Sequence, residues 1–147
     1  FMAFSQVALV SLVLVVWLYY MDRVATAKEV FNSTGQGVLV TDVSGTIQSV
    51  NPAFTRLTGY TEEEVLGRNP NLLSAGRQSK EFYTTMWSQI GQEGLWQGKV
   101  WNKRKNGEEY LELLSISAVK DDSGDVTRYV GTFSDITPMH VKGSRSI

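Results

Sequence analysis

The sequence offers few side chains for catalysis or metal binding. It contains no cysteine and a single histidine, His140, near the C-terminal end. The lack of cysteine excludes disulfides, thiolate metal sites and cysteine-based photochemistry or redox switching. One histidine so close to the end gives no basis for a zinc or haem site in the folded body. No Ser/His/Asp set or suitably spaced carboxylate pair is found, so we expect no enzymatic activity.

Two polar side chains at alternating positions are better candidates for a binding site, Asn102 and Glu112. The residues that share one face are Trp96, Gly98, Val100 and Asn102 in a predicted strand over 95–103, and Glu112, Leu114 and Ile116 in a predicted strand over 109–119. If Asn102 and Glu112 point inward, each needs a partner, because an unpaired buried polar group costs roughly a few kcal/mol. In one interpretation the partner is a ligand; in the other, the two side chains pair with each other or with the backbone.

The elements that would position these residues are short. Strands are predicted over 37–42 and 46–50 around a hairpin at 43–45, and over 95–103, 109–119 and 127–135. Asn51-Pro52 predicts the start of one helix, and Thr61 with Glu64 forms a capping-box pattern for another. Strands, a group of helices and then strands again predict an α+β fold with a five-stranded antiparallel sheet and short helices on one face.

A third and longer helix is predicted from Ser79 onward. Phe82, Met86 and Ile90 recur every four residues and would form its buried stripe. Trp87 lies next to this stripe, and we assign it, with Tyr60, to the core rather than to a cofactor site.

The first twenty-one residues form an uncharged apolar run that is long enough to cross a bilayer of about 30 Å as a helix. Trp17, Tyr19 and Tyr20 precede the charged pair Asp22-Arg23, which is the interfacial position that aromatic residues favour. A transmembrane helix over 1–21 in contact with membrane lipid is therefore favoured. A signal peptide and a buried helix of a soluble dimer are the two alternatives.

An amphipathic linker helix is predicted over 22–34, and it ends at Asn32-Ser33-Thr34-Gly35. Its apolar stripe consists of Val24, Ala27, Val30 and Phe31. Such a stripe needs a cover, either the same helix of a second chain or the domain that follows. We also expect Leu111 and Leu113 to be exposed on the open face of the sheet, where the linker helix or a dimer partner would cover them. These six residues are the candidate dimer interface.

Short motifs in the region from about Val30 to Thr137 carry a family resemblance. They are Asn51-Pro52-Ala53-Phe54, Leu57-Thr58-Gly59-Tyr60, Val65-Leu66-Gly67-Arg68-Asn69-Pro70, Gly94-Leu95-Trp96-Gln97-Gly98, Asn102-Lys103-Arg104-Lys105-Asn106-Gly107 and Asp135-Ile136-Thr137. In this order and spacing they resemble a PAS domain with its C-terminal PAC segment. The resemblance implies a PAS domain over 35–137 that dimerises through its N-terminal helix, followed by a tail over 138–147.

The same resemblance implies a signalling role. Asp135 and Thr137 would pass the signal to an output domain outside this chain, commonly a kinase or a cyclic-dinucleotide enzyme. The similar proteins are bacterial membrane-bound signalling proteins, which implies anchoring in the inner membrane with the PAS domain in the cytoplasm. The near-equal numbers of acidic and basic residues, 15 and 14, do not favour nucleic acid as a partner. The basic run from Lys99 to Lys105 is interpreted as a solvated hairpin.

Around Gly67-Arg68-Asn69 the chain is similar to blue-light LOV domains, and Asn102 corresponds to one of their flavin-binding asparagines. Three positions depart from that pattern. Pro70 stands in place of the adduct-forming cysteine, Glu112 in place of a second asparagine and Phe133 in place of the signalling glutamine. The resemblance therefore implies no LOV-type FMN adduct, and the lack of histidine on the longer predicted helix argues against haem.

The chain is also similar to FAD-holding, redox-sensing PAS domains of nitrogen-fixation and methane-oxidation regulators. FAD is the leading specific cofactor, ranked behind no ligand or an unknown small molecule. The pocket candidates are Leu39, Thr41, Phe54, Asn69, Leu72, Leu73, Trp96, Asn102, Glu112, Leu114, Ile116 and Phe133. Two functions stay open: a sensor of a small ligand or redox cofactor, and a ligand-free module that dimerises and relays motion.

Overall fold

The computed structural model describes residues 2–138, and its side chains from residue 6 onward. The chain divides into two compact units, one up to Ser33 and one from Thr34 onward, and each is described by itself. Of the predicted C-terminal tail over 138–147, only residue 138 is among the described residues. His140 lies outside them.

Helix α1 forms the first unit and runs without interruption over Met2–Ser33. The segment Gln6–Ser33 is long and apolar enough to cross a membrane. Near its middle, Arg23 donates a 2.6 Å hydrogen bond to the Tyr19 hydroxyl one turn earlier, and its guanidinium lies 5.0 Å from the Tyr19 ring centroid. The predicted membrane helix and linker helix are thus one continuous α-helix, which ends at Ser33 as the polar run after Phe31 predicts.

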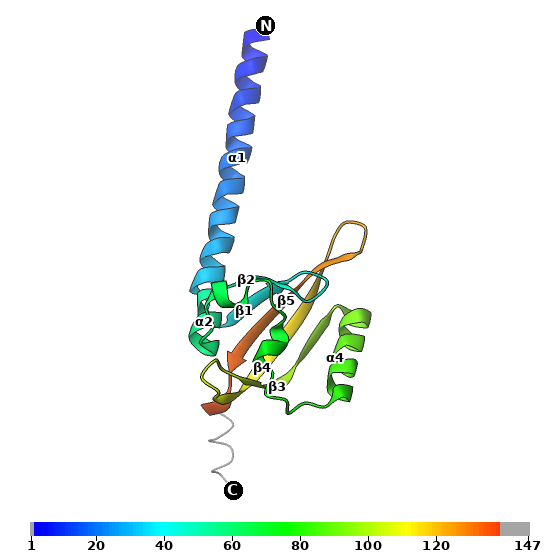
Figure 1. The fold of residues 1–147 in the computed structure, drawn as a ribbon. Coiled ribbons are helices and arrows are strands. Elements are labelled where there is room, and N and C mark those ends of the chain that lie inside the picture. The colour runs from blue at the N-terminus through cyan, green and yellow to red at the C-terminus, as the bar shows by residue number, and fades with distance from the viewer. Residues whose placement is uncertain (1, 139–147) are drawn as a thin grey trace. The chain divides into compact units, whose positions relative to one another are not determined.

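The second unit is built on a five-stranded antiparallel sheet, as the sequence predicts. Its strands are β1 (Gly37–Thr41), β2 (Ile47–Val50), β3 (Leu95–Lys103), β4 (Glu109–Lys120) and β5 (Val126–Asp135). Their order across the sheet is β2-β1-β5-β4-β3, so the N-terminal hairpin pairs with the last strand (Figure 1). This pairing places β5 at the centre of the sheet, between the two hairpins.

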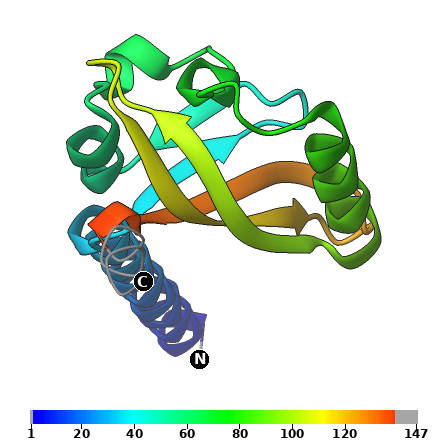
Figure 2. The same cartoon turned by 90° about the horizontal axis from the view of Figure 1, so that it is seen from below.

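Short helices gather on one face of the twisted sheet (Figure 2). They are α2 (Pro52–Thr58), α3 (Glu62–Val65), the 3₁₀ turn η1 (Pro70–Leu73) and α4 (Lys80–Glu93). The predicted starts are confirmed: Asn51 caps α2, Thr61 and Glu64 form a reciprocal capping box, and Ser79 caps α4. Helix α4 ends at Gly94, whose φ of 76° lies in the left-handed region that glycine adopts without strain.

Asn51 also ties the helix layer to the sheet. Its Oδ1 accepts hydrogen bonds from the backbone N–H groups of Val38 and Phe54, and its Nδ2 donates to the Gln36 carbonyl. Asn51 is 1% exposed, and its three hydrogen bonds satisfy the side-chain amide inside the protein. One side chain thus fixes where α2 begins relative to β1.

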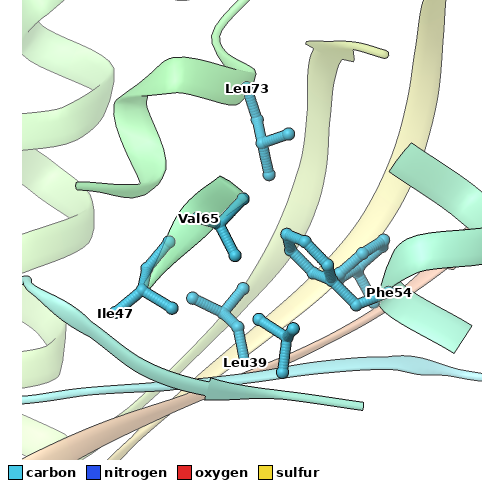
Figure 3. Packing of buried hydrophobic residues seen from close by; sticks show 7 residues of the cluster. Leu39, Ile47, Phe54, Val65 and Leu73 are labelled. Atoms are coloured by element: carbon cyan, nitrogen blue, oxygen red, sulfur yellow. The ribbon is translucent and has the colours of Figure 1, made fainter. Parts of the chain in front are cut away.

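Two clusters of buried apolar side chains fill the space between sheet and helices. The first contains Leu39, Ile47, Val50, Phe54, Val65, Leu73 and Phe133 (Figure 3). In it, the Phe54 and Phe133 rings meet edge to face with centroids 6.0 Å apart. The second contains Met86, Ile90, Trp96 and Val100 and lies under α4. The buried stripe predicted for the long helix is confirmed at Met86 and Ile90, while Phe82 is only partly buried.

Two predictions of burial are wrong. Trp87 is 46% exposed instead of lying in the core, because it lies beside the buried stripe of α4 and turns its ring edge to face against Tyr129, 5.2 Å away. Leu111 is only 5% exposed, although the alternation of β4 predicts an exposed side chain there. The chain after β5 returns along this part of β4, where the Ile136 N–H donates to the Leu111 carbonyl. Leu113, at 37% exposure, agrees with the prediction.

Candidate ligand cavity and signal junction

A cavity of about 340 Å³ lies between the sheet and the helix layer. Its wall comes from β1, β3, β4 and β5 on one side and from η1 and α4 on the other. The lining residues are Leu39, Thr41, Gly45, Asn69, Pro70, Asn71, Leu73, Ser74, Tyr83, Met86, Trp87, Val100, Asn102, Glu112, Leu114, Ile116, Tyr129, Gly131 and Phe133. Most of these side chains are apolar, and no lysine or arginine is among them. The volume falls at the lower end of the range for small-molecule sites, about 300–1,000 Å³.

Nine of the twelve pocket candidates lie on the cavity wall. They are Leu39, Thr41, Asn69, Leu73, Asn102, Glu112, Leu114, Ile116 and Phe133. The other three lie elsewhere. Phe54 is fully buried in the first cluster, and Leu72 packs against that cluster from its edge. Trp96 packs edge to face on Phe82 and lies across Gly98, where an added Cβ would come within 2.5 Å of its ring.

Sequence reasoning missed the aromatic side chains at the α4 side of the cavity. Tyr83 and Trp87 come from α4 and Tyr129 from β5, and all three are lining residues. Tyr83 lies one residue after Phe82 and three residues before Met86, so it falls on the edge of the buried face of α4. A helical-wheel reading that allowed a wider apolar face could have identified it.

Asn102 and Glu112 both point inward and pair with each other. The Asn102 Nδ2 donates a 2.7 Å hydrogen bond to Glu112 Oε1 across β3 and β4. Glu112 is 2% exposed, and its Oε2 has no partner with hydrogen-bonding geometry among the described residues. The neighbouring Tyr110 hydroxyl is equally buried and equally without one. The protein thus satisfies Oε1 directly, while Oε2 is enclosed by the protein next to the Tyr110 hydroxyl.

The surroundings of Glu112 change its acidity. Burial raises the pKa of its carboxyl to about 8, although the neighbouring Tyr110 hydroxyl and, to a smaller extent, the hydrogen bond from Asn102 act in the opposite direction. The negative charge of Asp135 raises this pKa further. Burial also raises the pKa of the Tyr110 phenol, and the nearby Glu112 carboxyl adds to this effect. Glu112 is thus mainly protonated at neutral pH, as a buried carboxyl without a cation partner should be.

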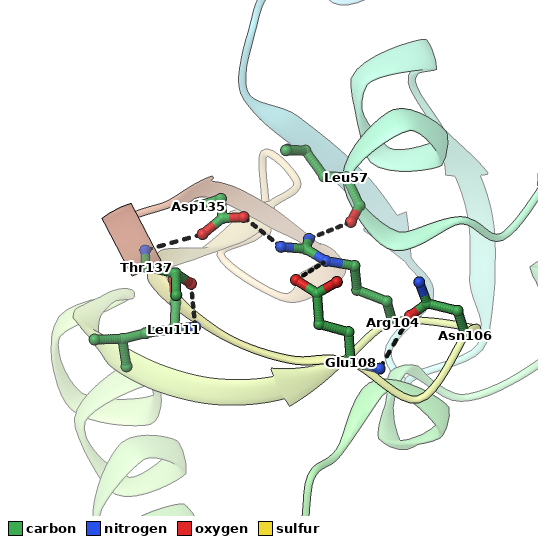
Figure 4. Close-up of polar contacts among 7 residues, drawn as sticks. All are labelled: Leu57, Arg104, Asn106, Glu108, Leu111, Asp135 and Thr137. Carbon is green, nitrogen blue, oxygen red and sulfur yellow. Dashed lines mark hydrogen bonds and ion pairs between the residues drawn. The ribbon is translucent and has the colours of Figure 1, made fainter. Parts of the chain in front are cut away.

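A polar junction lies at the end of β5, where the chain leaves the sheet (Figure 4). Glu112 of β4 is paired with Asp135 of this junction in the sheet register. Arg104 donates from Nη2 to Asp135 Oδ2 at 2.6 Å and from Nη1 to the Leu57 carbonyl at 2.5 Å. Its guanidinium also lies 4.3 Å from the Tyr110 ring centroid. Arg104, assigned from sequence to a solvated hairpin, is instead only 19% exposed. It joins the end of β5 to the last turn of α2.

Thr137 completes the junction. Its N–H donates to Asp135 Oδ1, and its hydroxyl accepts a 2.9 Å hydrogen bond from the Leu111 N–H of β4. Burial alone would raise the pKa of Asp135, but the hydrogen bonds from Arg104 and Thr137 outweigh it, so the pKa lies below its usual value. Asp135 is therefore ionised at neutral pH and holds the chain where it leaves the sheet.

Comparison with known proteins identifies the fold family. A family model described as PAS domain matches residues 35–138. The chain belongs to the PAS domain family. The PAS domain thus accounts for the whole second unit up to the last described residue, and the resemblance of the motifs is confirmed.

Several regulators and photoreceptors are similar to this PAS domain. A nitrogen fixation regulatory protein of Klebsiella oxytoca is 34% identical over 100 residues, covering 68% of this chain and 20% of that protein. A blue-light photoreceptor of Listeria innocua is 32% identical over 112 residues, covering 74% of this chain and 44% of that protein. The chain thus spans between a fifth and a half of the length of these relatives.

Solved structures support the same fold. The crystal structure of a PAS domain from Colwellia psychrerythraea superposes with a TM-score of 0.75 at 21% identity, covering 80% of this chain and 99% of that one. An RNA-binding Light-Oxygen-Voltage receptor gives a TM-score of 0.71 at 29% identity, covering 77% and 33%. The PAS domain is therefore a sensory or signalling module by family.

Among the described residues, no group of three or more His, Asp or Glu side chains could hold a metal ion.

Proposed function

We propose that this PAS domain senses a small molecule in the cavity between its sheet and helices. It then passes the change through Asp135 and Thr137 to an output domain outside this chain. One observation carries the proposal: the hydrogen-bonded polar pair of Asn102 and Glu112 lies in the wall of a largely apolar cavity. Apolar walls with a few convergent polar groups are the usual composition of a ligand site.

A flavin ring is the specific ligand that the residues fit best. Its pyrimidine edge carries alternating carbonyl acceptors and an N–H donor, which match the Asn102 amide and the Glu112 carboxyl. Leu114, Ile116 and Phe133 supply apolar surface for the ring system. Because no lysine or arginine lines the cavity, the phosphates of FAD would have to lie outside it. Bound there, a flavin would supply reversible redox chemistry, while the protein would orient the ring and exclude water.

A LOV-type photoadduct is not part of the proposal. That chemistry needs a thiol, and the chain contains no cysteine. The cavity wall has Pro70 at the corresponding place. We therefore propose redox or simple occupancy, rather than light-driven bond formation, as the sensed change.

Membrane anchoring and dimerisation belong to the same proposal. Helix α1 is long and apolar enough to cross a membrane. We propose that it anchors the domain in the inner membrane, with the PAS domain in the cytoplasm. The dimer candidates on α1 are Val24, Ala27, Val30 and Phe31, and Leu113 is the half-exposed candidate on the sheet. A second chain placed along α1 would keep the two output domains side by side. A ligand-free relay is the alternative, and the apolar surface of Leu113 is the observation that favours it.

The test is to identify what the purified full chain holds. The protein is purified in detergent from flavin-replete cells, its absorbance is recorded through the near-ultraviolet and visible range, and any released molecule is identified by mass. We expect a bound small molecule in the wild type and a large loss of it in Asn102→Ala. Gln97→Ala is the matched control, since Gln97 is an amide on the opposite, exposed face of β3. Protein free of any small molecule would support the ligand-free relay instead.

A further inference from the structure

We propose that Glu112 transmits the state of the cavity to Asp135, so that the charge of one buried carboxyl controls the junction through which the chain leaves the domain. This inference rests on the proposed function and adds the route by which the cavity is read. Glu112 belongs to both places: it lines the cavity and lies beside the junction.

The register of the sheet brings the two carboxyls together. Glu112 of β4 and Asp135 of β5 are directly opposite each other in the antiparallel ladder and share its inner face. Residues opposed in this way have Cβ atoms about 4.5–5.5 Å apart. On the other side of Glu112, Asn102 of β3 holds Oε1. A change at the cavity wall therefore reaches Asp135 across a single strand spacing.

The rest of β5 offers no comparable route near the junction. The two residues of β5 nearest Asp135 on the cavity face are Gly131 and Phe133, and neither has a side chain that can carry charge or exchange hydrogen bonds. Glu112 is therefore the carboxyl that lies between the cavity and the ion pair of Arg104 and Asp135.

The charge state of Glu112 responds to its contacts in the cavity. The raised pKa of about 8 keeps the carboxyl mainly protonated near neutral pH, but close enough to ionisation for one new contact to change it. A ligand that donates a hydrogen bond or places a positive charge beside the Asn102–Glu112 pair favours the carboxylate. A ligand that accepts a hydrogen bond there favours the neutral acid.

The groups that face Glu112 determine what ionisation does. Asn102 comes from β3, Tyr110 from β4 and Asp135 from β5. Arg104, in the turn after β3, contacts the Tyr110 ring and Asp135. Across the cavity the titratable groups are the phenols of Tyr83 and Tyr129. Helix α2 presents its Leu57 carbonyl to Arg104, and its charged residue Arg56 is exposed. Arg104 is thus the one cation among these groups.

A second negative charge next to Asp135 would strain the junction. The Glu112 carboxylate repels Asp135 and so weakens its hold on Arg104, which also donates to the Leu57 carbonyl. If Asp135 shifts, the Thr137 N–H loses its acceptor at Oδ1, and the bond between Thr137 and the Leu111 N–H loosens. Ionisation of Glu112 therefore releases the chain after β5, and neutral Glu112 keeps it bound.

The proton itself is the probe that tests this route without a ligand. In full-length protein in nanodiscs, NMR spectra from about pH 6 to about pH 10 follow the Glu112 carboxyl carbon, the Thr137 N–H and the Arg104 Nε–H. We expect the Thr137 and Arg104 signals to shift with the same midpoint as Glu112. In Glu112→Gln that transition disappears. It is kept in Glu108→Gln, which removes a more exposed carboxylate paired with Arg104 at 3.4 Å.

Two results would overturn the inference: Thr137 and Arg104 signals that stay constant while Glu112 titrates, or the same transition in Glu112→Gln. If Glu112→Gln fails to fold, Asp135→Asn serves instead, because it should lower the Glu112 midpoint by removing the neighbouring charge. An unchanged midpoint in that variant counts against the coupling. The outcome is independent of ligand binding, so an empty cavity would contradict the proposed function and leave this route standing.

Discussion

The Asn102 side-chain amide and the Glu112 carboxyl form a 2.7 Å hydrogen bond across β3 and β4, in the wall of the cavity. This pair satisfies one carboxyl oxygen, and the other, Oε2, is enclosed by the protein. A protein that only needed a stable core could place apolar residues at both positions at no cost, since replacing both partners of a buried pair is often nearly neutral. The proposed binding role would explain why a polar pair stands in the wall of this cavity.

Removing the amide should destabilise the domain. Asn102→Ala removes the partner of Oε1 on a carboxyl that is 2% exposed, so we expect a loss of about 2 kcal/mol in the free energy of unfolding. Denaturant titration followed by circular dichroism measures it. The control Gln97→Ala, on the exposed face of the same strand, should stay within about 0.5 kcal/mol of wild type. Equal stabilities of the two variants would contradict the importance of the pair.

The raised pKa of Glu112 predicts a pH dependence of stability. In the unfolded chain the carboxyl ionises at its ordinary value of 4.5, whereas in the folded domain it holds its proton to about pH 8. Between these values the folded state binds more protons, so stability falls as pH rises through this window and levels off above it. We expect a decrease on the order of a few kcal/mol.

Glu112→Gln removes this group from the titration. The variant keeps an acceptor for Asn102, and its stability should be nearly flat over the same window. Thermal unfolding of both proteins at about pH 5, 7 and 9 measures the difference. A wild type that is equally stable at all three values would show that Glu112 titrates normally.

Much of the local structure of this domain could be predicted from the sequence, because helix caps and strand alternation depend on residues that are close together in the chain. The Thr61 capping box and the strand over 95–103 agree with the structure, since caps and alternation depend on residues close in sequence. The burial of Leu111 was missed because it depends on Thr137, 26 residues further on. Arg104 was likewise assigned to an exposed turn, although its partner Asp135 follows 31 residues later.

The cavity could be predicted only in part for a related reason. Alternation along β3 and β4 correctly placed Asn102 and Glu112 on the inner face. It could not show that the Trp96 ring turns aside to cover Gly98, because that depends on the missing side chain at 98 and on Phe82 of α4. The position of Trp87 depends in the same way on Tyr129 of a distant strand.

The junction should need arginine and not only a positive charge. Arg104 contacts Asp135, the Leu57 carbonyl and the Tyr110 ring at once, which a lysine ammonium cannot reproduce. Because Arg104 is partly exposed, solvent reduces the effect, and we expect Arg104→Lys to destabilise the domain by about 1 kcal/mol. Urea unfolding gives the value. Glu108→Gln, which changes the more exposed partner of Arg104, should leave the stability nearly unchanged. Equal losses of stability in both variants would contradict the role of the Arg104 guanidinium in the junction.

The apolar character of α1 predicts membrane retention. Leu14→Arg places a charge in the middle of its apolar run, where it costs about 3 kcal/mol. Cell fractionation with an alkaline wash should find the wild type in the membrane pellet and a large part of the variant in the soluble fraction. Ser33→Arg, at the end of the helix, is the control and should stay in the pellet. Retention of both variants, or of neither, would refute the membrane span.

The most direct test of a sensory function compares the junction in loaded and stripped protein. Hydrogen exchange is followed at the Leu111 N–H, which donates to Thr137 Oγ1 at 2.9 Å, in protein as purified and in protein refolded free of small molecules. Sensing predicts that protection of this amide changes between the two states, while the Phe54 N–H bonded to buried Asn51 keeps its protection. Equal protection of Leu111 in a loaded and a stripped cavity would contradict the central claim that occupancy is transmitted to the junction.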